Sequence, residues 1–118
     1  MSGAPHGIVG YGAYVPRHRL QHAELGAALG GRPSKGFRTV ASYDEDSTTM
    51  GAEAARRALA GAGGSPPHTI LFATSSPAYL DKTNATAIHA ALDLGHAGFA
   101  VDVGGAPRSA IGALRSAA

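Results

Sequence analysis

Two uninterrupted apolar runs constrain the fold of this chain more than any other feature. The runs HTILFATSS at 68–76 and GFAVDV at 98–103 lack the polar alternation of a strand that faces water on one side. Such runs are typical of strands that are buried on both faces, as in parallel sheets covered by helices. A helical pattern follows each run, so we expect an α/β fold of parallel strands with covering helices.

The remaining segments complete an order of strand, helix, helix, strand, helix, strand and helix. GIVGYGAYVP at 7–16 is predicted as the first strand, and 32–47 as a long irregular loop. The predicted helices are, in chain order, 20–31 with Gly30-Gly31 as its stop, a helix from Asp46 or Ser47 to Ala60, one capped by Asp81 with Gly95 at its C′ position, and one that starts near Pro107. A sheet of three strands is thin and leaves exposed edges, so we expect a portion of a larger unit or a chain that docks on a partner.

Helical spacing also predicts which side chains meet. Glu53 and Arg57 are four residues apart in the orientation that favours an ion pair. The apolar residues expected to face inward are Ala85, Ile88 and Leu92 in the third helix, and Ala110, Ile111, Leu114 and Ala117 in the fourth.

Composition excludes several classes of function. The 118 residues contain no cysteine, which removes disulfides, thiolate metal sites and cysteine nucleophiles together. A formal charge of +2 and 6% aromatic residues give no basic or stacking surface for nucleic acid. The N-terminus lacks the pattern of a signal peptide, and no apolar run is long enough to cross a bilayer. We therefore expect a soluble, cytoplasmic domain with no nucleic-acid or membrane partner, no metal and no cofactor.

Three motifs have a structural explanation that outweighs the functional one. Gly10 and Gly12 suggest a dinucleotide fingerprint, but its third glycine is missing and no helix opens there, which favours close backbone packing in a strand. His18 and His22 have a metal-ligand spacing without a third ligand, which favours solvated side chains. The acidic trio at 44–46 precedes a helix, where capping and the helix dipole explain it.

Two loops at the carboxyl ends of the buried strands are the candidate site. They are TSSPAYLDKTNAT at 74–86 and DVGGAPRSA at 102–110, and ligand sites of parallel sheets gather at such ends. The second loop also opens a helix, whose N–H groups favour an anion or an oxyanion. The substrate-binding candidates are Ser75, Ser76, Tyr79 and Gly105, which we expect to border one pocket together with Pro107. Ser109 is expected inside the helix rather than at its mouth.

The order of GIVGYGAYVPRHRL, SYDEDSTTMGAEAARRAL, ILFATSSPAYLDKTNATAIHAALDLG and FAVDVGGAPRSAIGAL resembles the start of the thiolase-fold condensing enzymes. It is similar above all to the archaeal-type 3-hydroxy-3-methylglutaryl-CoA synthases, and more distantly to ketoacyl-ACP synthase III. The resemblance implies that residues 1–118 are the N-terminal part of a thiolase-like domain, truncated before its second half. It also implies an acyltransferase family that uses acyl-CoA or acyl-carrier thioesters and forms dimers.

The resemblance further implies that both catalytic positions in this part of the fold are changed. Counting from Asp102, the family's cysteine nucleophile corresponds to Pro107, and the family's glutamate acid corresponds to Ser75. Pro107 supplies neither a thiolate nor the backbone N–H that resembles half of the oxyanion hole. Ser75 has no pKa near neutrality with which to act as a general acid. No residue of the chain is therefore expected to be catalytic.

Three hypotheses follow for a fragment of acyl-CoA metabolism of this kind. The chain binds acyl thioesters without forming an acyl-enzyme, or it is a non-catalytic subunit that positions the substrate or a partner chain of a thiolase-like assembly, or it is a truncation without function alone. In each of them the isolated chain is expected to be inactive in condensation. We also expect it not to be a stable monomer, because its last helix exposes an apolar face.

Overall fold

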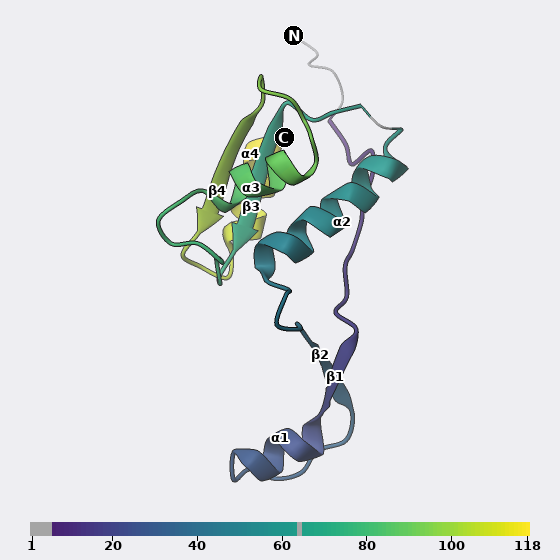
Figure 1. Cartoon of the computed structure of the whole chain (residues 1–118), viewed down its shortest axis with the longest axis vertical. Coiled ribbons are helices and arrows are strands. Elements are labelled where there is room, and N and C mark those ends of the chain that lie inside the picture. Colours follow the sequence, from purple (N-terminus) through teal and green to yellow (C-terminus); the bar gives the residue numbers. More distant parts are fainter. Residues whose placement is uncertain (1–5, 64) are drawn as a thin grey trace. The chain divides into compact units, whose positions relative to one another are not determined.

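The computed structural model describes residues 6–63 and 65–118. Two compact units make up the chain, one from the chain up to Tyr14 together with Ser47–Ala118, and the other from Val15–Asp46. The elements are β1 (His18–Gln21), α1 (His22–Ala28), β2 (Phe37–Val40), α2 (Ser47–Gly61), β3 (Thr69–Thr74), α3 (Asn84–Ala91), β4 (Phe99–Gly104) and α4 (Ser109–Ala117) (Figure 1). None of the helices in the described ranges is long and apolar enough to cross a bilayer.

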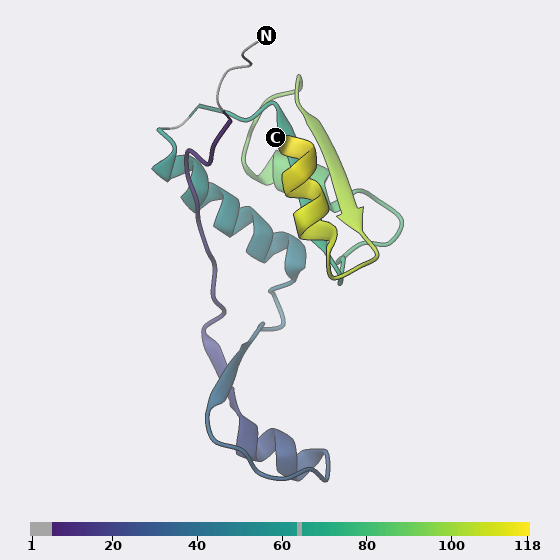
Figure 2. The same ribbon diagram turned by 180° about the vertical axis from the view of Figure 1, so that it is seen from behind.

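A parallel pair of strands is the centre of the larger unit. β3 and β4 are in register from Thr69 opposite Phe99 to Thr74 opposite Gly104. α3 and α4 cover opposite faces of this pair, as the two views in Figures 1 and 2 show. The predicted strands and their parallel, helix-covered arrangement are therefore confirmed, with strand ends that differ by one or two residues. Their predicted burial is not, because the residues of β3 and β4 are half-buried or exposed.

Small side chains build the core of this unit. Ala52 of α2, Ala85 and Ile88 of α3 and Ala113 of α4 are buried. The inward face predicted for the third helix is thus confirmed at Ala85 and Ile88, while Leu92 is half-buried at the end of the helix.

The predicted inward face of α4 is wrong in part. Ile111 and Leu114 are 63% and 62% exposed, and Ala113 is the residue that is buried against the sheet. The reason is the width of the sheet, because two strands cannot cover the whole apolar face of a helix. Leu114 and Ala117 instead border an open apolar cavity with Leu71 of β3.

The first strand predicted at 7–16 is also wrong, and within the described ranges the parallel sheet has two strands rather than three. The segment up to Tyr14 lies along α2. A Cβ atom added to Gly10 would come within 2.7 Å of the Ala58 carbonyl oxygen, and one added to Gly12 would overlap the Ala54 carbonyl. Only glycine lets a backbone approach a helix this closely. The glycines therefore serve close backbone packing as predicted, but against a helix.

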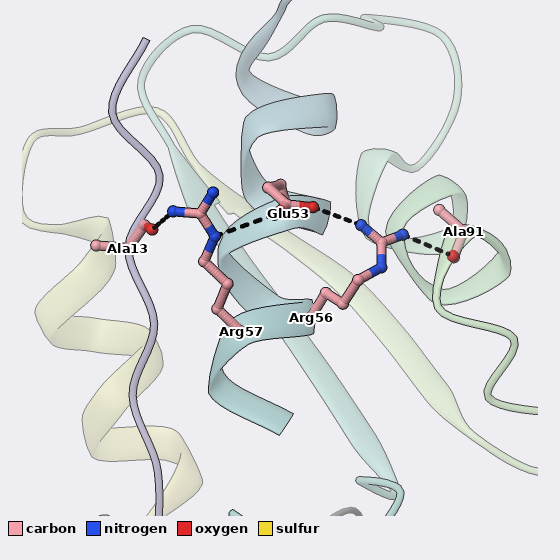
Figure 3. A network of polar contacts seen from close by, with 5 residues as sticks. All are labelled: Ala13, Glu53, Arg56, Arg57 and Ala91. Carbon is pink, nitrogen blue, oxygen red and sulfur yellow. Dashed lines mark hydrogen bonds and ion pairs between the residues drawn. The ribbon is translucent and has the colours of Figure 1, made fainter. Parts of the chain in front are cut away.

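A polar network around Glu53 fastens two other segments to α2 (Figure 3). The carboxylate accepts hydrogen bonds from Arg56 at 2.6 Å and from Arg57 at 3.0 Å, and the second is the predicted pair. These bonds, that of Arg56 first, hold the pKa of Glu53 below its ordinary value. Arg57 also donates to the Ala13 carbonyl at 2.7 Å, and Arg56 to the Ala91 carbonyl at 3.4 Å. The network links the N-terminal segment and the end of α3 to one helix.

The smaller unit contains an antiparallel pair of strands that the sequence analysis missed. β1 pairs with β2 from His18 opposite Val40 to Gln21 opposite Phe37. The predicted long loop at 32–47 is therefore wrong where it contains β2. The guanidinium of Arg19 lies 4.4 Å from the centre of the Phe37 ring, a cation–π contact across the two strands.

The helix predicted at 20–31 is shorter in the structure, because Leu20 and Gln21 belong to β1 and α1 ends at Ala28. Its predicted stop is confirmed. Gly30 has a φ of 67°, and the N–H of Gly31 donates to the Gly26 carbonyl at 2.8 Å.

Two residues of the acidic trio at 44–46, Asp44 and Glu45, form hydrogen bonds within a turn, in addition to the capping and helix-dipole role predicted for the trio. Asp44 accepts a hydrogen bond from the Ser42 hydroxyl, and Glu45 accepts one from the Ser42 N–H at 2.9 Å. Both carboxylates close a turn before α2. The hydrogen bond from Ser42 lowers the pKa of the Asp44 carboxyl.

Candidate functional site

The carboxyl ends of β3 and β4 open into one cavity of about 310 Å³. Its lining comes from the end of β3 and from the turn and first residues of α4, and consists of Ala73, Thr74, Ser75, Ala106, Pro107, Ser109 and Ala110. The structure therefore brings together Ser75 and Pro107, the two positions that the sequence analysis assigned to the altered catalytic residues. Their convergence follows from the parallel pairing of the strands that precede them.

Ser76, Tyr79 and Gly105 do not line this cavity, so the expectation of one pocket for all five positions is wrong for these three. The backbone of Ser76 turns away, with its carbonyl bonded to the Ser47 hydroxyl at 2.8 Å. The ring of Tyr79 lies under the Lys82 ammonium, 3.9 Å from the ring centre. Gly105 has a φ of 91° and forms the bend that leads from β4 to the cavity wall.

The turn before α4 places Pro107 differently from the prediction. α4 begins at Ser109 with Arg108 in the capping position, so Pro107 precedes the helix instead of opening it. Ser109 stands at the mouth of the helix and lines the cavity, which corrects its predicted place inside the helix. Its hydroxyl donates to the Ala106 carbonyl at 2.7 Å and accepts from the Ala106 N–H at 3.3 Å. The hydroxyl is thus engaged in holding the turn.

Hydroxyl groups are the only side-chain polar groups in the cavity lining, from Thr74, Ser75 and Ser109. Hydroxyls can orient a carbonyl or an amide by hydrogen bonds, but they do not transfer protons efficiently near neutral pH. Alanine and proline side chains form the rest of the wall. The arrangement can hold a small polar group against a short apolar surface, and the lining supplies no general base.

A polar network around Asn84 and Asp102 was missed by the sequence analysis. Asn84, the first residue of α3, is 0% exposed, and Thr48 of α2 is 5% exposed. Asp102 of β4 accepts hydrogen bonds from the Asn84 N–H at 2.8 Å, the Asn84 amide at 2.9 Å and the Ala85 N–H at 2.7 Å. The carboxylate therefore caps α3 from another strand, which corrects the predicted cap at Asp81.

The C-terminal end of α3 requires a correction as well. The helix ends at Ala91 with Leu92 as its C-cap, so Asp93, with a φ of 52°, takes the C′ position that was predicted for Gly95. Aspartate adopts the left-handed conformation more readily than most residues, because a short polar side chain of this kind can hydrogen-bond to the nearby backbone.

A signal for the network was present in the sequence, because Asp102 interrupts an apolar strand. A carboxylate inside such a strand requires hydrogen-bond partners. Burial raises the pKa of Asp102, but the hydrogen bonds from the Asn84 side chain and from the Asn84 and Ala85 N–H groups outweigh it and hold the pKa below its ordinary value. Asp102 is therefore ionised at neutral pH.

The described residues contain no group of three or more histidine and carboxylate side chains placed to hold a metal ion. His18 lies in β1, and the Nδ1 atom of His22 lies 3.2 Å from the Lys35 carbonyl oxygen.

No family model matches the chain.

Curated relatives and solved structures match most of the chain. It is 42% identical over 92 residues to a hydroxymethylglutaryl-CoA synthase of Thermococcus sibiricus, covering 73% of this chain and 25% of that protein. A synthase of the same name from Aeropyrum pernix is 38% identical over 119 residues, covering 93% and 33%. The crystal structure of 3-oxoacyl-[acyl-carrier-protein] synthase III from Thermus thermophilus matches with a TM-score of 0.82 and 26% identity, covering 95% and 37%.

These matches define the class of protein. The fold is part of the thiolase-like fold of the condensing enzymes, as the sequence resemblance implied. More particularly, the chain is a partial homologue of archaeal hydroxymethylglutaryl-CoA synthase, with a structural likeness to ketoacyl synthase III. It spans about a quarter to a third of the length of the curated relatives it matches.

Proposed function

We propose that the cavity between Ser75 and Pro107 binds an acyl thioester, on CoA or on a carrier, and that the chain forms no covalent acyl-enzyme. The single observation that carries this proposal is Pro107 in the cavity wall, two residues before α4, in a chain without cysteine. In the family that the sequence resembles, a cysteine is expected at that position.

The physical argument rests on what Pro107 removes. A thiolate at a helix N-terminus has a lowered pKa and attacks thioesters readily. Proline has no nucleophile and no N–H to stabilise an oxyanion. Ser109 does not replace them, because its hydroxyl is bonded to Ala106 and the cavity lining offers no base. Binding of the thioester is compatible with this lining, whereas its cleavage lacks the required groups.

A second candidate function is a non-catalytic subunit that positions substrate or partner in a thiolase-like assembly, as a homodimer or with another chain. The observation that favours it is a set of large apolar side chains left exposed in the larger unit, namely Ile8, Val9, Tyr11, Ile111 and Leu114. Exposed apolar surface of this kind marks interaction sites. Within either function, residues 1–118 correspond to the N-terminal part of a thiolase-like domain.

The test combines a mass measurement with a binding measurement. Intact-protein mass spectrometry after incubation with acetyl-CoA should show no adduct, and a stoichiometric acetyl group on one residue would overturn the non-acylating function. Equilibrium dialysis with labelled acetyl-CoA should show binding that Ser75→Leu weakens by about tenfold, since the larger side chain fills the cavity. Ser116→Leu is the matched control, because its side chain is exposed near the end of α4 and outside the cavity lining, and it should leave the affinity unchanged.

A further inference from the structure

The loop between β3 and α3, residues 75–83, is anchored at two backbone positions by buried or half-buried side chains. The Ser47 hydroxyl donates to the Ser76 carbonyl at 2.8 Å. Three residues further on, the Asn84 side chain binds both backbone groups of Tyr79: its oxygen accepts from the Tyr79 N–H at 3.0 Å, and its amide donates to the Tyr79 carbonyl at 2.9 Å. One amide side chain thus pairs with Tyr79 as a neighbouring strand would.

The Asn84 side chain is fully used in this arrangement. An asparagine side chain can accept two hydrogen bonds and donate two. The Asn84 oxygen accepts from Tyr79 and from the Thr48 hydroxyl at 2.9 Å, and its amide donates to Tyr79 and to Asp102 at 2.9 Å. Thr48 and Asp102 therefore determine which end of the amide faces which backbone group. Aspartate would lack the two donors, and leucine would lack all four bonds.

Two consecutive residues at the start of α2 act on the same loop. Ser47 contacts it directly, and Thr48 contacts it through Asn84. Ser47 and Thr48 therefore have a role beyond beginning a helix. Ser75, which lines the cavity together with Pro107, lies directly before the first of these anchored positions.

We propose that Asn84 is a positioning residue that, with Ser47 and Thr48, fixes loop 75–83 and thereby sets the cavity wall at Ser75. The anchoring of the loop is argued from its hydrogen bonds alone. Its consequence for ligand binding rests on the proposed function above. Loop anchoring of this kind predicts a local effect on 75–83 that exceeds any effect on the sheet.

Hydrogen exchange in the 118-residue chain separates these effects. The measured quantity is a ratio, the exchange rate of the Tyr79 amide in the loop divided by that of the Leu71 amide in β3. A general loss of stability would raise both rates and would therefore change their ratio far less than a local opening of the loop. Each lost bond to Tyr79 itself should raise this ratio about fivefold, so Asn84→Ala, which loses both of them, should raise it about 25-fold. Thr48→Val removes the bond that orients the Asn84 amide and should raise the ratio about fivefold. Thr48→Ser retains the hydroxyl and should restore the wild-type ratio. Thr86→Val, an exposed threonine of α3, is the matched control and should change nothing.

Should Asn84→Ala fail to fold, the comparison of Thr48→Val with Thr48→Ser decides the matter. Equal ratios in those two variants would overturn the proposal. With acetyl-CoA as the probe, the dissociation constant should rise in the same order as the exchange ratio. A variant that has a raised exchange ratio but an unchanged dissociation constant for acetyl-CoA would overturn the positioning role. If the unmodified chain binds no acetyl-CoA, the proposed function fails, and the exchange ratio alone decides the loop anchoring.

Discussion

The turn after β3 and the turn after β4 both border the cavity, yet different interactions hold them. Residues 75–83 are bound by side chains from α2 and α3, one of them fully buried. Residues 105–108 are held by a hydrogen-bonded turn between Ala106 and Ser109. The first turn therefore depends on residues of α2 in addition to local bonds such as that from the Ser76 N–H to the Thr74 hydroxyl, whereas the second is held by local bonds. A substitution far along the chain can move the first turn, whereas the second should respond only to its own residues.

The largest expected effect comes from removing the carboxylate on which the first turn depends. Asp102→Asn should lower the free energy of unfolding by about 3 kcal/mol, because three donors lose a charged acceptor and the new amide group faces them. Urea unfolding followed by circular dichroism measures this. A loss below 1 kcal/mol would mean that the network contributes little, and the contrast between the two turns would then disappear.

Acid should weaken the same turn to a smaller extent, since a protonated carboxyl still accepts hydrogen bonds. The folded-state pKa of Asp102 is lowered, so its contribution to stability is present above the unfolded pKa of about 4 and is lost as the pH falls through the folded value. Unfolding free energies between pH 7 and pH 3 should therefore fall more steeply in the wild type than in Asp102→Asn. Equal slopes would contradict the assigned charge, because Glu53 and Asp44 titrate in both proteins.

The smallest effect is expected in the second turn. Ser109→Ala removes two local bonds to Ala106 and should cost about 1 kcal/mol or less, with faster exchange confined to 105–109. Ser116→Ala in the same helix is the control, because it removes one exposed bond to the Gly112 carbonyl and leaves the turn intact. Faster exchange at Tyr79 in Ser109→Ala would show that the two turns are coupled after all.

The sequence predicts the parts of this fold that arise from long apolar runs. β3, β4 and α2 were identified because each has a strong and continuous pattern. β1 and β2 were missed because HRLQ and FRTV are only four residues long and lack a continuous apolar run, whereas their pairing with each other is a contact between distant segments. The cap of α3 was missed for a related reason, because Asp102 lies 18 residues beyond Asn84 in the chain.

In the candidate site, too, some positions could be predicted from the sequence and others could not. Ser75 and Pro107 were predicted to converge because parallel strands bring their carboxyl ends to one edge of a sheet. The positions of Ser76 and Tyr79 could not be predicted in this way, because side chains of other helices orient the loop. Local patterns and strand direction give the place of a site, whereas the orientation of a loop depends on distant partners.

The contact of Arg57 with Ala13 has a consequence for how the length of the chain can vary. The bond joins residues 44 positions apart, and the same guanidinium lies 5.5 Å from the ring centre of Tyr14. Residues 15–46, which lie between these two parts of the larger unit in the sequence, are therefore an insertion in that unit. The entropy lost on closing a flexible loop grows only with the logarithm of its length, about 0.6 kcal/mol for each doubling. Insertions and deletions within 15–46 should therefore be tolerated by the larger unit far more readily than any change of spacing between Thr48, Asn84 and Asp102.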